Sequence, residues 1–217
     1  INLRAILSLP KGTEHFVSDL HGEANAFIHM IKNASGVIRK KVDEAYGDSL
    51  CEEEKRALCA LIYYPDERID LVKRRHKGQP NNALQEGFDY SNMYEWYKRR
   101  LHQVVAIARA ITIKYTRSKV YKHLPKDYAY VIKELLHESS LEQKDRQAYY
   151  NAVIEAIIET GCAEQLLISI TYFIHSMAID MLHIVGDIFD RGPRPHKILD
   201  VLSTIRDYDI QWGNHDI

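Results

Sequence analysis

Three short segments of the 217-residue sequence end in side chains that can bind metal ions or phosphate. They read HFVSDLHGE at 15–23, HIVGDIFDRGPRP at 183–195 and IQWGNHD at 210–216. Each contains an apolar run typical of a buried strand, followed by a turn that contains glycine. Carboxylate, imidazole and amide groups therefore stand where three strands would end, which raises the question of whether they act together.

The residue types at these positions suit a metal centre. In an extended segment, residues two positions apart point to the same side, so Asp19 and His21 can offer an oxygen and a nitrogen to one metal ion. Asp187 has two carboxylate oxygens and could bridge two cations, and Asn214 adds a neutral oxygen beside Gly213. Such a mixed set of oxygen and nitrogen ligands favours Mn²⁺, Fe or Zn²⁺.

The remaining polar residues suit phosphate chemistry. Two metal ions about 3.5–4 Å apart can hold a hydroxide in line with a phosphorus atom and stabilise the leaving oxygen. Arg191 has the planar guanidinium that binds phosphate oxygens in pairs. His215 stands where a general acid is needed, and Asp190 could stabilise its imidazolium form.

Each motif has a simpler interpretation when it is taken alone. An isolated Asp-x-His is usually a surface or capping arrangement, GDIFDRG can be a charged turn with a salt bridge, and GNHD is equally unspecific. Their occurrence together, in this order and each after a strand, favours a common site over three independent turns.

The surrounding sequence predicts elements that would position these residues. Strands are expected at 14–19, 181–187 and 207–216, with helices after the first two at 22–33 and 195–207. Strands that alternate with helices indicate a mainly parallel sheet, so the fold class is α/β. In such sheets, sites form at the carboxyl ends of the strands, where all three motifs stand.

The sequence between the first two motifs is predicted to be helical. Apolar spacing indicates helices at 91–115, 127–139 and 145–161, and a loop at 77–82. The most apolar run, 166–182, is too short to span a bilayer and is interpreted as a core helix.

These patterns predict two parts of the chain. Residues 1–35 and 179–217 would form the catalytic core, and residues 36–178 would form a helical insert.

Composition narrows the class of protein and its partners. Apolar residues make up 46% and charged residues 27%, a balance typical of a soluble globular protein. The formal net charge of −1 argues against a nucleic-acid-binding surface. Three unclustered cysteines fit neither a disulfide framework nor a zinc knuckle and indicate a reducing, cytoplasmic location. The sequence shows no signal peptide, and its start at Ile1 and end at Ile217 suggest a part of a longer protein.

The order D-x-H, G-D-x-x-D-R-G and G-N-H-D resembles the calcineurin-like metallophosphoesterase superfamily, its phosphoprotein-phosphatase type especially. The resemblance implies a metallophosphoesterase-type sheet sandwich, here partial and with a large helical insertion. It also implies a role for each motif residue in a two-metal site: Asp19 and His21 on the first metal, Asp187 bridging both, Asn214 on the second, and His215 with Asp190 assisting departure of the leaving group.

Three wider stretches resemble the N-terminal portion of the class III fructose-1,6-bisphosphatase family more narrowly. They are INLRAILSLPKGTEHFVSDLHGE, NASGVIRKKVDE and VGDIFDRGPRPHKILD, and the wide separation of the first two motifs is also similar to that family. The resemblance implies a gluconeogenic enzyme that hydrolyses fructose 1,6-bisphosphate to fructose 6-phosphate and phosphate. It further implies Mn²⁺ in the two-metal site that activates the hydroxide, a sugar bisphosphate as partner, and neither nucleic acid nor membrane. A homo-oligomer is left open.

Two other functions compete with the fructose-1,6-bisphosphatase interpretation, and the sequence differs from the family pattern in one respect. A phosphoprotein or a dinucleotide polyphosphate could replace the sugar as substrate, although a helical cap would suit a small substrate better than a phosphoprotein. A non-catalytic interaction module is the second rival, and the intact set of ligands argues against it. The family has further histidine ligands after G-N-H-D, and the sequence ends before them, so the 217-residue chain alone is expected to be inactive.

Overall fold

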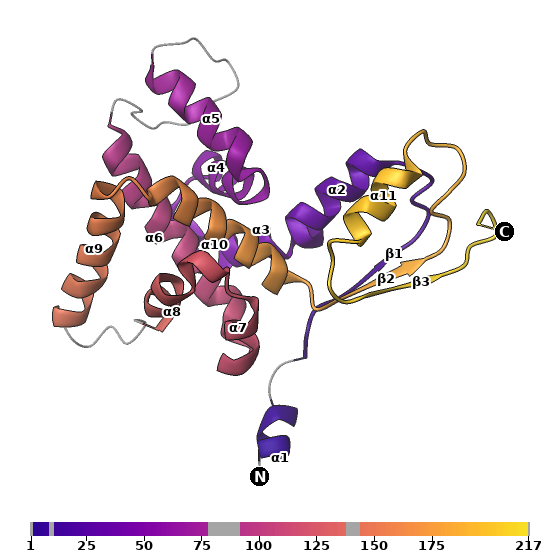
Figure 1. Cartoon of the computed structure of the whole chain (residues 1–217), viewed down its shortest axis with the longest axis horizontal. Coiled ribbons are helices and arrows are strands. Elements are labelled where there is room, and N and C mark those ends of the chain that lie inside the picture. Colours follow the sequence, from indigo (N-terminus) through magenta and orange to yellow (C-terminus); the bar gives the residue numbers. More distant parts are fainter. Residues whose placement is uncertain (1, 9–10, 78–91, 138–143, 217) are drawn as a thin grey trace. The chain divides into compact units, whose positions relative to one another are not determined.

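The computed structural model describes residues 2–8, 11–77, 92–137 and 144–216. They form a mostly helical α/β structure (Figure 1). Its elements are α1 (Asn2–Leu7), β1 (Glu14–Val17), α2 (Ala24–Asn33), η1 (Ala34–Gly36), α3 (Val37–Tyr46), η2 (Gly47–Ser49), α4 (Glu52–Tyr63), α5 (Pro65–His76), α6 (Met93–Thr112), α7 (Arg117–His123), η3 (Lys126–Tyr128), α8 (Ala129–His137), α9 (Lys144–Glu159), α10 (Ala163–Ala178), β2 (Met181–Val185), α11 (Pro195–Leu202) and β3 (Tyr208–Gln211). The loop predicted at 77–82 lies, apart from Lys77, outside the described residues.

The chain divides into two compact units. Residues 1–38 and 175–217 form one unit, called here the sheet unit, and residues 39–174 form the other, called here the helical unit. The division predicted from the sequence, a catalytic core at 1–35 and 179–217 and an insert at 36–178, assigns roles as well as boundaries and stays a prediction.

The sheet unit contains three parallel strands in the order β1-β2-β3. Glu14 of β1 is opposite Met181 of β2, and Leu182 of β2 is opposite Tyr208 of β3. This confirms the α/β class and the parallel sheet. β1 and β2 end earlier than predicted because residues beyond them, such as Asp19 and Asp187, adopt left-handed backbone conformations that a strand cannot contain. β3 also ends earlier than predicted, at Gln211.

Helices α2 and α11 pack side by side against one face of this sheet (Figure 1). Leu182 and Ile184 of β2 point to that face and are fully buried. Their partners include Phe27 of α2 and Ile198 of α11. Burial of each such side chain contributes about 1.5–3 kcal/mol, so these contacts hold the strand ends in register.

The opposite face of the sheet carries Phe16 and Val185, whose side chains are exposed. The Phe16 ring stacks on the ring of His183, with centroids 4.4 Å apart. Nδ1 of His183 lies 2.9 Å from a carboxylate oxygen of Asp209 on the neighbouring strand. The imidazole of His183 therefore pairs with a carboxylate of the neighbouring strand on this face.

The helical unit is organised around α6. This helix begins where the side chain of Asn92 accepts a hydrogen bond from the backbone N–H of Glu95, a typical N-cap. Its buried side chains recur at helical spacing and include Trp96, Leu101 and Ile107. The core-facing helix predicted over 91–115 is confirmed for Met93–Thr112, and Ser91 lies outside the described residues.

The apolar run at 166–182 is only partly a helix. Helix α10 ends at Ala178, and β2 begins at Met181, so the prediction of a helix through 182 is wrong at its C-terminal end. The turn is fixed by Asp180, whose carboxylate accepts a hydrogen bond of 2.6 Å from the backbone N–H of Thr13 just before β1. This bond holds Asp180 beside the residue that precedes β1, next to the start of β2 at Met181.

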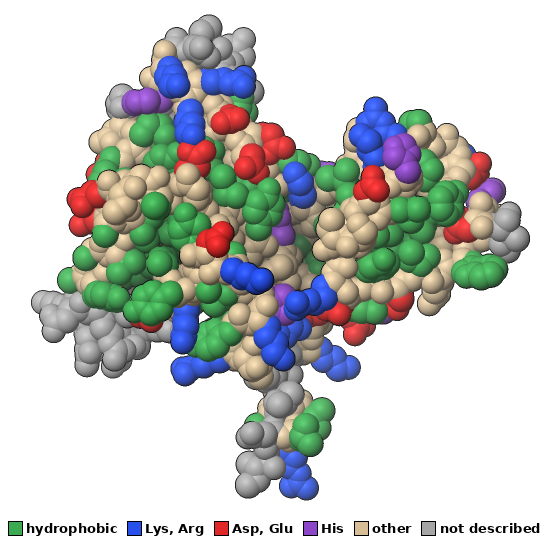
Figure 2. Space-filling model, viewed as in Figure 1, with side chains coloured by type: hydrophobic (Ala, Val, Ile, Leu, Met, Phe, Trp, Pro, Cys, Tyr) green, Lys and Arg blue, Asp and Glu red, His purple; other side chains and the backbone are tan. Residues whose placement is uncertain are grey.

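No helix among the described residues combines the length and the apolar character needed to cross a membrane. Figure 2 shows acidic and basic side chains interspersed over the visible face of the helical unit.

Candidate metal and phosphate site

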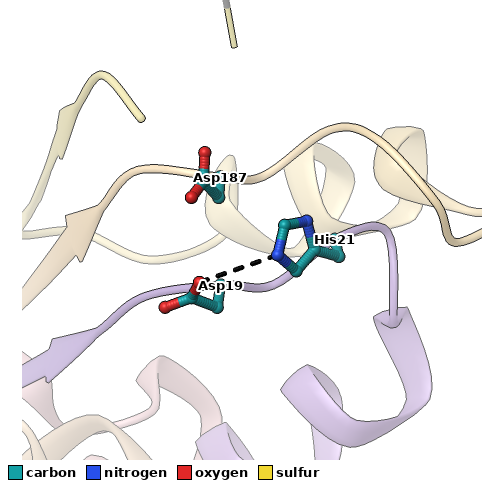
Figure 3. Close-up of side chains that lie close together, drawn as sticks. All are labelled: Asp19, His21 and Asp187. Carbon is teal, nitrogen blue, oxygen red and sulfur yellow. Dashed lines mark ion pairs between the residues drawn. The ribbon is translucent and has the colours of Figure 1, made fainter. Parts of the chain in front are cut away.

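Asp19, His21 and Asp187 converge at the carboxyl ends of β1 and β2 (Figure 3). One potential ligand atom from each lies within 4.8 Å of the other two. Nε2 of His21 is 3.6 Å from Oδ1 of Asp19, and the imidazole is largely buried whereas the Asp19 side chain is 66% exposed. The three residues form a group that could hold a metal ion.

The chemistry of this group fits a divalent cation. Two carboxylates and an imidazole provide a mixed oxygen and nitrogen donor set, which suits first-row transition metals. Nδ1 of His21 is buried and has no hydrogen-bond partner among the described residues. The ring nitrogen that faces Asp19 is Nε2, so the fit to a metal ion rests on the donor set and not on the unpartnered Nδ1.

Backbone hydrogen bonds continue from the sheet into the two loops that carry these residues. The N–H of His21 donates to the carbonyl of Asp187, and the N–H of Gly22 donates to the carbonyl of Ile188, both at 2.8 Å. In the return direction, the N–H of Gly192 donates to the carbonyl of His21 at 2.7 Å. The first two motifs are thus held together by their main chains, independently of their side chains.

Two glycines are required by close approach of these backbones. A Cβ atom on Gly192 would overlap the carbonyl oxygen of His21, and one on Gly213 would overlap the carboxylate of Asp187. In both places the neighbouring group is main chain or a proposed ligand that cannot move without changing the site. The glycines of GDIFDRG and GNHD therefore provide packing space as well as tight turns.

The site also concentrates unusual backbone geometry. Seven non-glycine residues among those described have positive φ angles, and five of them belong to the first two motifs: Asp19, His21, Asp187, Asp190 and Arg191. Such conformations are uncommon for non-glycine residues and cluster at functional sites. Asp19 and His21 therefore do not lie in the extended segment that the sequence predicted for them, because a left-handed φ is not a strand conformation.

A second group of side chains lies around His215. Its Nδ1 is 3.4 Å from Oδ2 of Asp190, and the same oxygen is 3.3 Å from Nε of Arg191. The rings of His215 and His21 meet edge to face, with centroids 5.6 Å apart. His215 also joins the first group through its backbone, because its N–H donates to Oδ1 of Asp187 at 3.0 Å. All three motifs therefore meet in one place.

Asn214 and Arg191 are less closely integrated. Asn214 is exposed in the turn after β3, between Gly213 and His215. The Arg191 side chain is 68% exposed and lies against its neighbour Asp190. The structure places both residues at the strand ends, and the roles predicted for them stay predictions.

Asp216 is a functional candidate that sequence reasoning missed. Its carboxylate accepts backbone hydrogen bonds from four residues, Asp187, Ile188, Phe189 and Gly213. Burial would raise the pKa of this carboxyl, but the four N–H groups favour its charged form and hold the pKa below the ordinary value of 3.8. The signal in the sequence is the acidic residue that ends the GNHD motif.

Comparison with known proteins identifies relatives over the full length of the chain. The family described as Firmicute fructose-1,6-bisphosphatase matches residues 1–217. Three curated proteins named fructose-1,6-bisphosphatase class 3 are similar across the whole chain: those of Phocaeicola vulgatus at 50% identity, Parabacteroides distasonis at 48% and Clostridium botulinum strain Loch Maree at 49%.

Each match covers 100% of this chain but only 30% of the relative. The chain therefore spans about a third of the length of these curated relatives. No solved structure matches it. The match over every residue, together with the joined motifs at the strand ends, establishes that this chain belongs to the Firmicute fructose-1,6-bisphosphatase family.

Proposed function

We propose that the protein containing this chain hydrolyses the 1-phosphate ester of fructose 1,6-bisphosphate, with Mn²⁺ as its cofactor and fructose 6-phosphate and phosphate as products. The observation that carries the proposal is the convergence of Asp19, His21 and Asp187 in a chain 50% identical, over its full length, to a protein named fructose-1,6-bisphosphatase class 3. The two parts support it differently: the residues support metal-assisted phosphate chemistry, and the relative supports the substrate.

The proposed metal ligands divide between two cations. Asp19 and His21 would hold the first, Asp187 would be shared, and Asn214 would contribute to the second. When bound, the cations would supply an activated water and neutralise charge on the phosphate. The chain's own contribution is to hold Asp19, His21 and Asp187 on two loops whose backbones are hydrogen-bonded to each other, with Asn214 in the turn after β3.

His215 is proposed as the general acid. Its Nδ1 faces Asp190, so Nε2 is the ring nitrogen that remains to donate a proton to the ester oxygen at C1 as the P–O bond breaks. Asp190 would stabilise the imidazolium form of His215 before that transfer. Arg191 would bind two phosphate oxygens through its guanidinium, of which only Nε lies against Asp190.

The sheet unit would then be part of a metallophosphoesterase-type sheet sandwich, and residues 36–178 would be an insert within it. In support, β1 and β2 are hydrogen-bonded neighbours although α3 to α10 lie between them in the sequence.

Substrate turnover tests the proposal. The protein at its natural full length would be incubated with Mn²⁺ and fructose 1,6-bisphosphate, a phosphopeptide or a dinucleotide polyphosphate, and phosphate release would be measured. We expect turnover of the sugar bisphosphate and its loss in a His215→Asn variant, which controls for contaminating phosphatases. Turnover of the phosphopeptide or the dinucleotide without turnover of the sugar would replace the proposed substrate.

A further inference from the structure

The carboxylate of Asp216 joins the second and third motifs through their backbones. Its Oδ2 accepts from the N–H of Asp187 at 2.6 Å and of Gly213 at 3.0 Å. Its Oδ1 accepts from the N–H of Ile188 at 2.9 Å and of Phe189 at 3.2 Å. Three successive N–H groups of one loop therefore point at a single carboxylate, an arrangement that binds anions.

These bonds act on the loop after β2, whose backbone conformation is unfavourable in itself. Asp187 has a φ of 56°, a left-handed value that costs a non-glycine residue free energy and persists only where surrounding contacts impose it. The Asp216 carboxylate binds the N–H of that same residue and those of the next two. It thereby opposes relaxation of the loop toward an ordinary conformation.

The contact is reciprocal. While Asp216 accepts from the loop of Asp187, the carboxylate of Asp187 accepts from the backbone N–H of His215, the residue next to Asp216. The proposed bridging ligand and the proposed general acid are therefore connected through two carboxylate–amide contacts that run in opposite directions. A change at Asp216 would alter the position of both.

We propose that Asp216 is a positioning residue, which touches neither metal nor substrate but holds the Asp187 carboxylate where the cations bind. The inference rests on the proposed function for the identity of the bound cation. It differs from a purely structural role, which would predict lower stability with unchanged metal affinity in every variant that folds.

The test is Asp216→Asn in the full-length protein, with Asp200→Asn on the exposed surface of α11 as the matched control. The amide replaces one oxygen by an NH₂ group, which cannot accept and would face two N–H donors. We expect Mn²⁺ affinity, measured by calorimetry, to fall about 10- to 100-fold, the range typical for residues that orient a ligand. Hydrogen exchange of the amides of Asp187, Ile188 and Phe189 should become faster in the same variant.

The two measurements must change together. A folded Asp216→Asn protein with wild-type Mn²⁺ affinity would overturn the proposal, whatever its thermal stability. If this variant does not fold, Asp216→Glu decides, because it keeps the carboxylate on a side chain longer by one carbon. In Asp216→Glu, the proposal is supported if the three amides stay protected and Mn²⁺ affinity stays at the wild-type value, or if both are lost. It is overturned if one of the two changes without the other.

The outcome is distinguishable from failure of the proposed function. Hydrolysis of fructose 1,6-bisphosphate by the wild-type protein is measured separately from Mn²⁺ binding. A protein that binds Mn²⁺ without hydrolysing the sugar would contradict the proposed function, and the metal and exchange measurements would still decide the role of Asp216.

Discussion

Asp187 has the largest number of connections of any proposed ligand. Its side chain lies near Asp19 and His21 and accepts from the N–H of His215, and its own N–H donates to Asp216. A residue that is proposed to serve two cations, and that also joins two loops, should tolerate no substitution. Two predictions at this scale separate metal binding from substrate binding.

Asp187→Asn should abolish turnover and lower the bound Mn²⁺, because an amide removes the negative charge that two cations would share. Mn²⁺ content after desalting and phosphate release from fructose 1,6-bisphosphate are the measurements. Asp207→Asn, at an exposed position just before β3, is the control and should behave as wild type. Unchanged metal stoichiometry in Asp187→Asn would assign the bridge to another residue.

Arg191→Lys should raise KM or lower kcat for fructose 1,6-bisphosphate by about tenfold or more while Mn²⁺ affinity is retained. Lysine keeps the charge but lacks the planar pair of donors that binds two phosphate oxygens. Arg206→Lys, exposed in the same unit, is the matched control. If the kinetics of Arg191→Lys equal those of wild type, the guanidinium does not bind the substrate phosphate.

At the level of elements, the site depends on the space between loops as much as on its ligands. The turn after β3 approaches the loop after β2 so closely that Gly213 has no room for a side chain. In the helical unit, helices α3 and α4 are joined by a network of charged side chains that has no part in the proposed chemistry. Each feature leads to a prediction.

Gly213→Ala should reduce Mn²⁺ affinity, because its methyl group would displace the carboxylate of Asp187. Gly161→Ala, after α9, is the contrasting variant: its Cβ would meet nothing within 4 Å, but its φ of 75° suits glycine. It should lose about 1 kcal/mol of stability with Mn²⁺ affinity unchanged. Calorimetry and thermal unfolding separate the two effects. Equal affinity in both variants would mean that the loop can give way at Gly213.

Acid should destabilise the α3–α4 contact. The hydrogen bond from Arg39 is the largest cause that lowers the pKa of Asp43 and of Glu52, whose ordinary values are 3.8 and 4.5. Because the pKa values are lower in the folded state, the unfolded chain takes up protons first as pH falls. The stabilisation is therefore present above the ordinary values and is lost as pH falls through and below them.

Arg39→Met should weaken this pH dependence. Thermal unfolding midpoints between pH 7 and pH 3 at low salt provide the measurement, with Lys40→Met at an exposed neighbouring position as control. The slope of the midpoint against pH should be smaller for Arg39→Met than for Lys40→Met. Equal slopes would show that other carboxyl groups dominate the acid response.

For the whole molecule, the expected effect of the metal is confined to one of the two units. The three side chains that converge all belong to the sheet unit, residues 1–38 and 175–217. Mn²⁺ at 100 times its Kd should stabilise the fold that binds it by about 2.7 kcal/mol. Hydrogen exchange of the full-length protein would be measured with Mn²⁺ and after chelation. Mn²⁺ should slow exchange more in residues 1–38 and 175–217 than in residues 39–174. An equal slowing of exchange in both units would contradict this site.

The sequence predicted the parts of this site whose signal is local. An apolar run that ends in Asp19 and His21, or in Asp187, is visible in single segments, and strands alternating with helices predicted the parallel sheet that brings them together. Asp216 could not be assigned in this way, because its partners are backbone N–H groups, which every residue has. The end of α10 was missed for a related reason: the Asp180 carboxylate accepts a hydrogen bond from the backbone N–H of Thr13, a contact that an apolar run does not reveal.

The pairing of β1 with β2 also determines when the site can form during synthesis. Thr13 and Asp180, which begin this pairing, are separated by 167 residues in the sequence. β1 leaves the ribosome before β2, its neighbour among the described strands, whereas the helices of 39–174 contact one another locally and can fold in between. Closing so long a loop costs entropy, and folding of the intervening helices shortens the flexible part of the chain. The site therefore forms only after β1 has been joined by β2 and β3, which are made after the helices of 39–174.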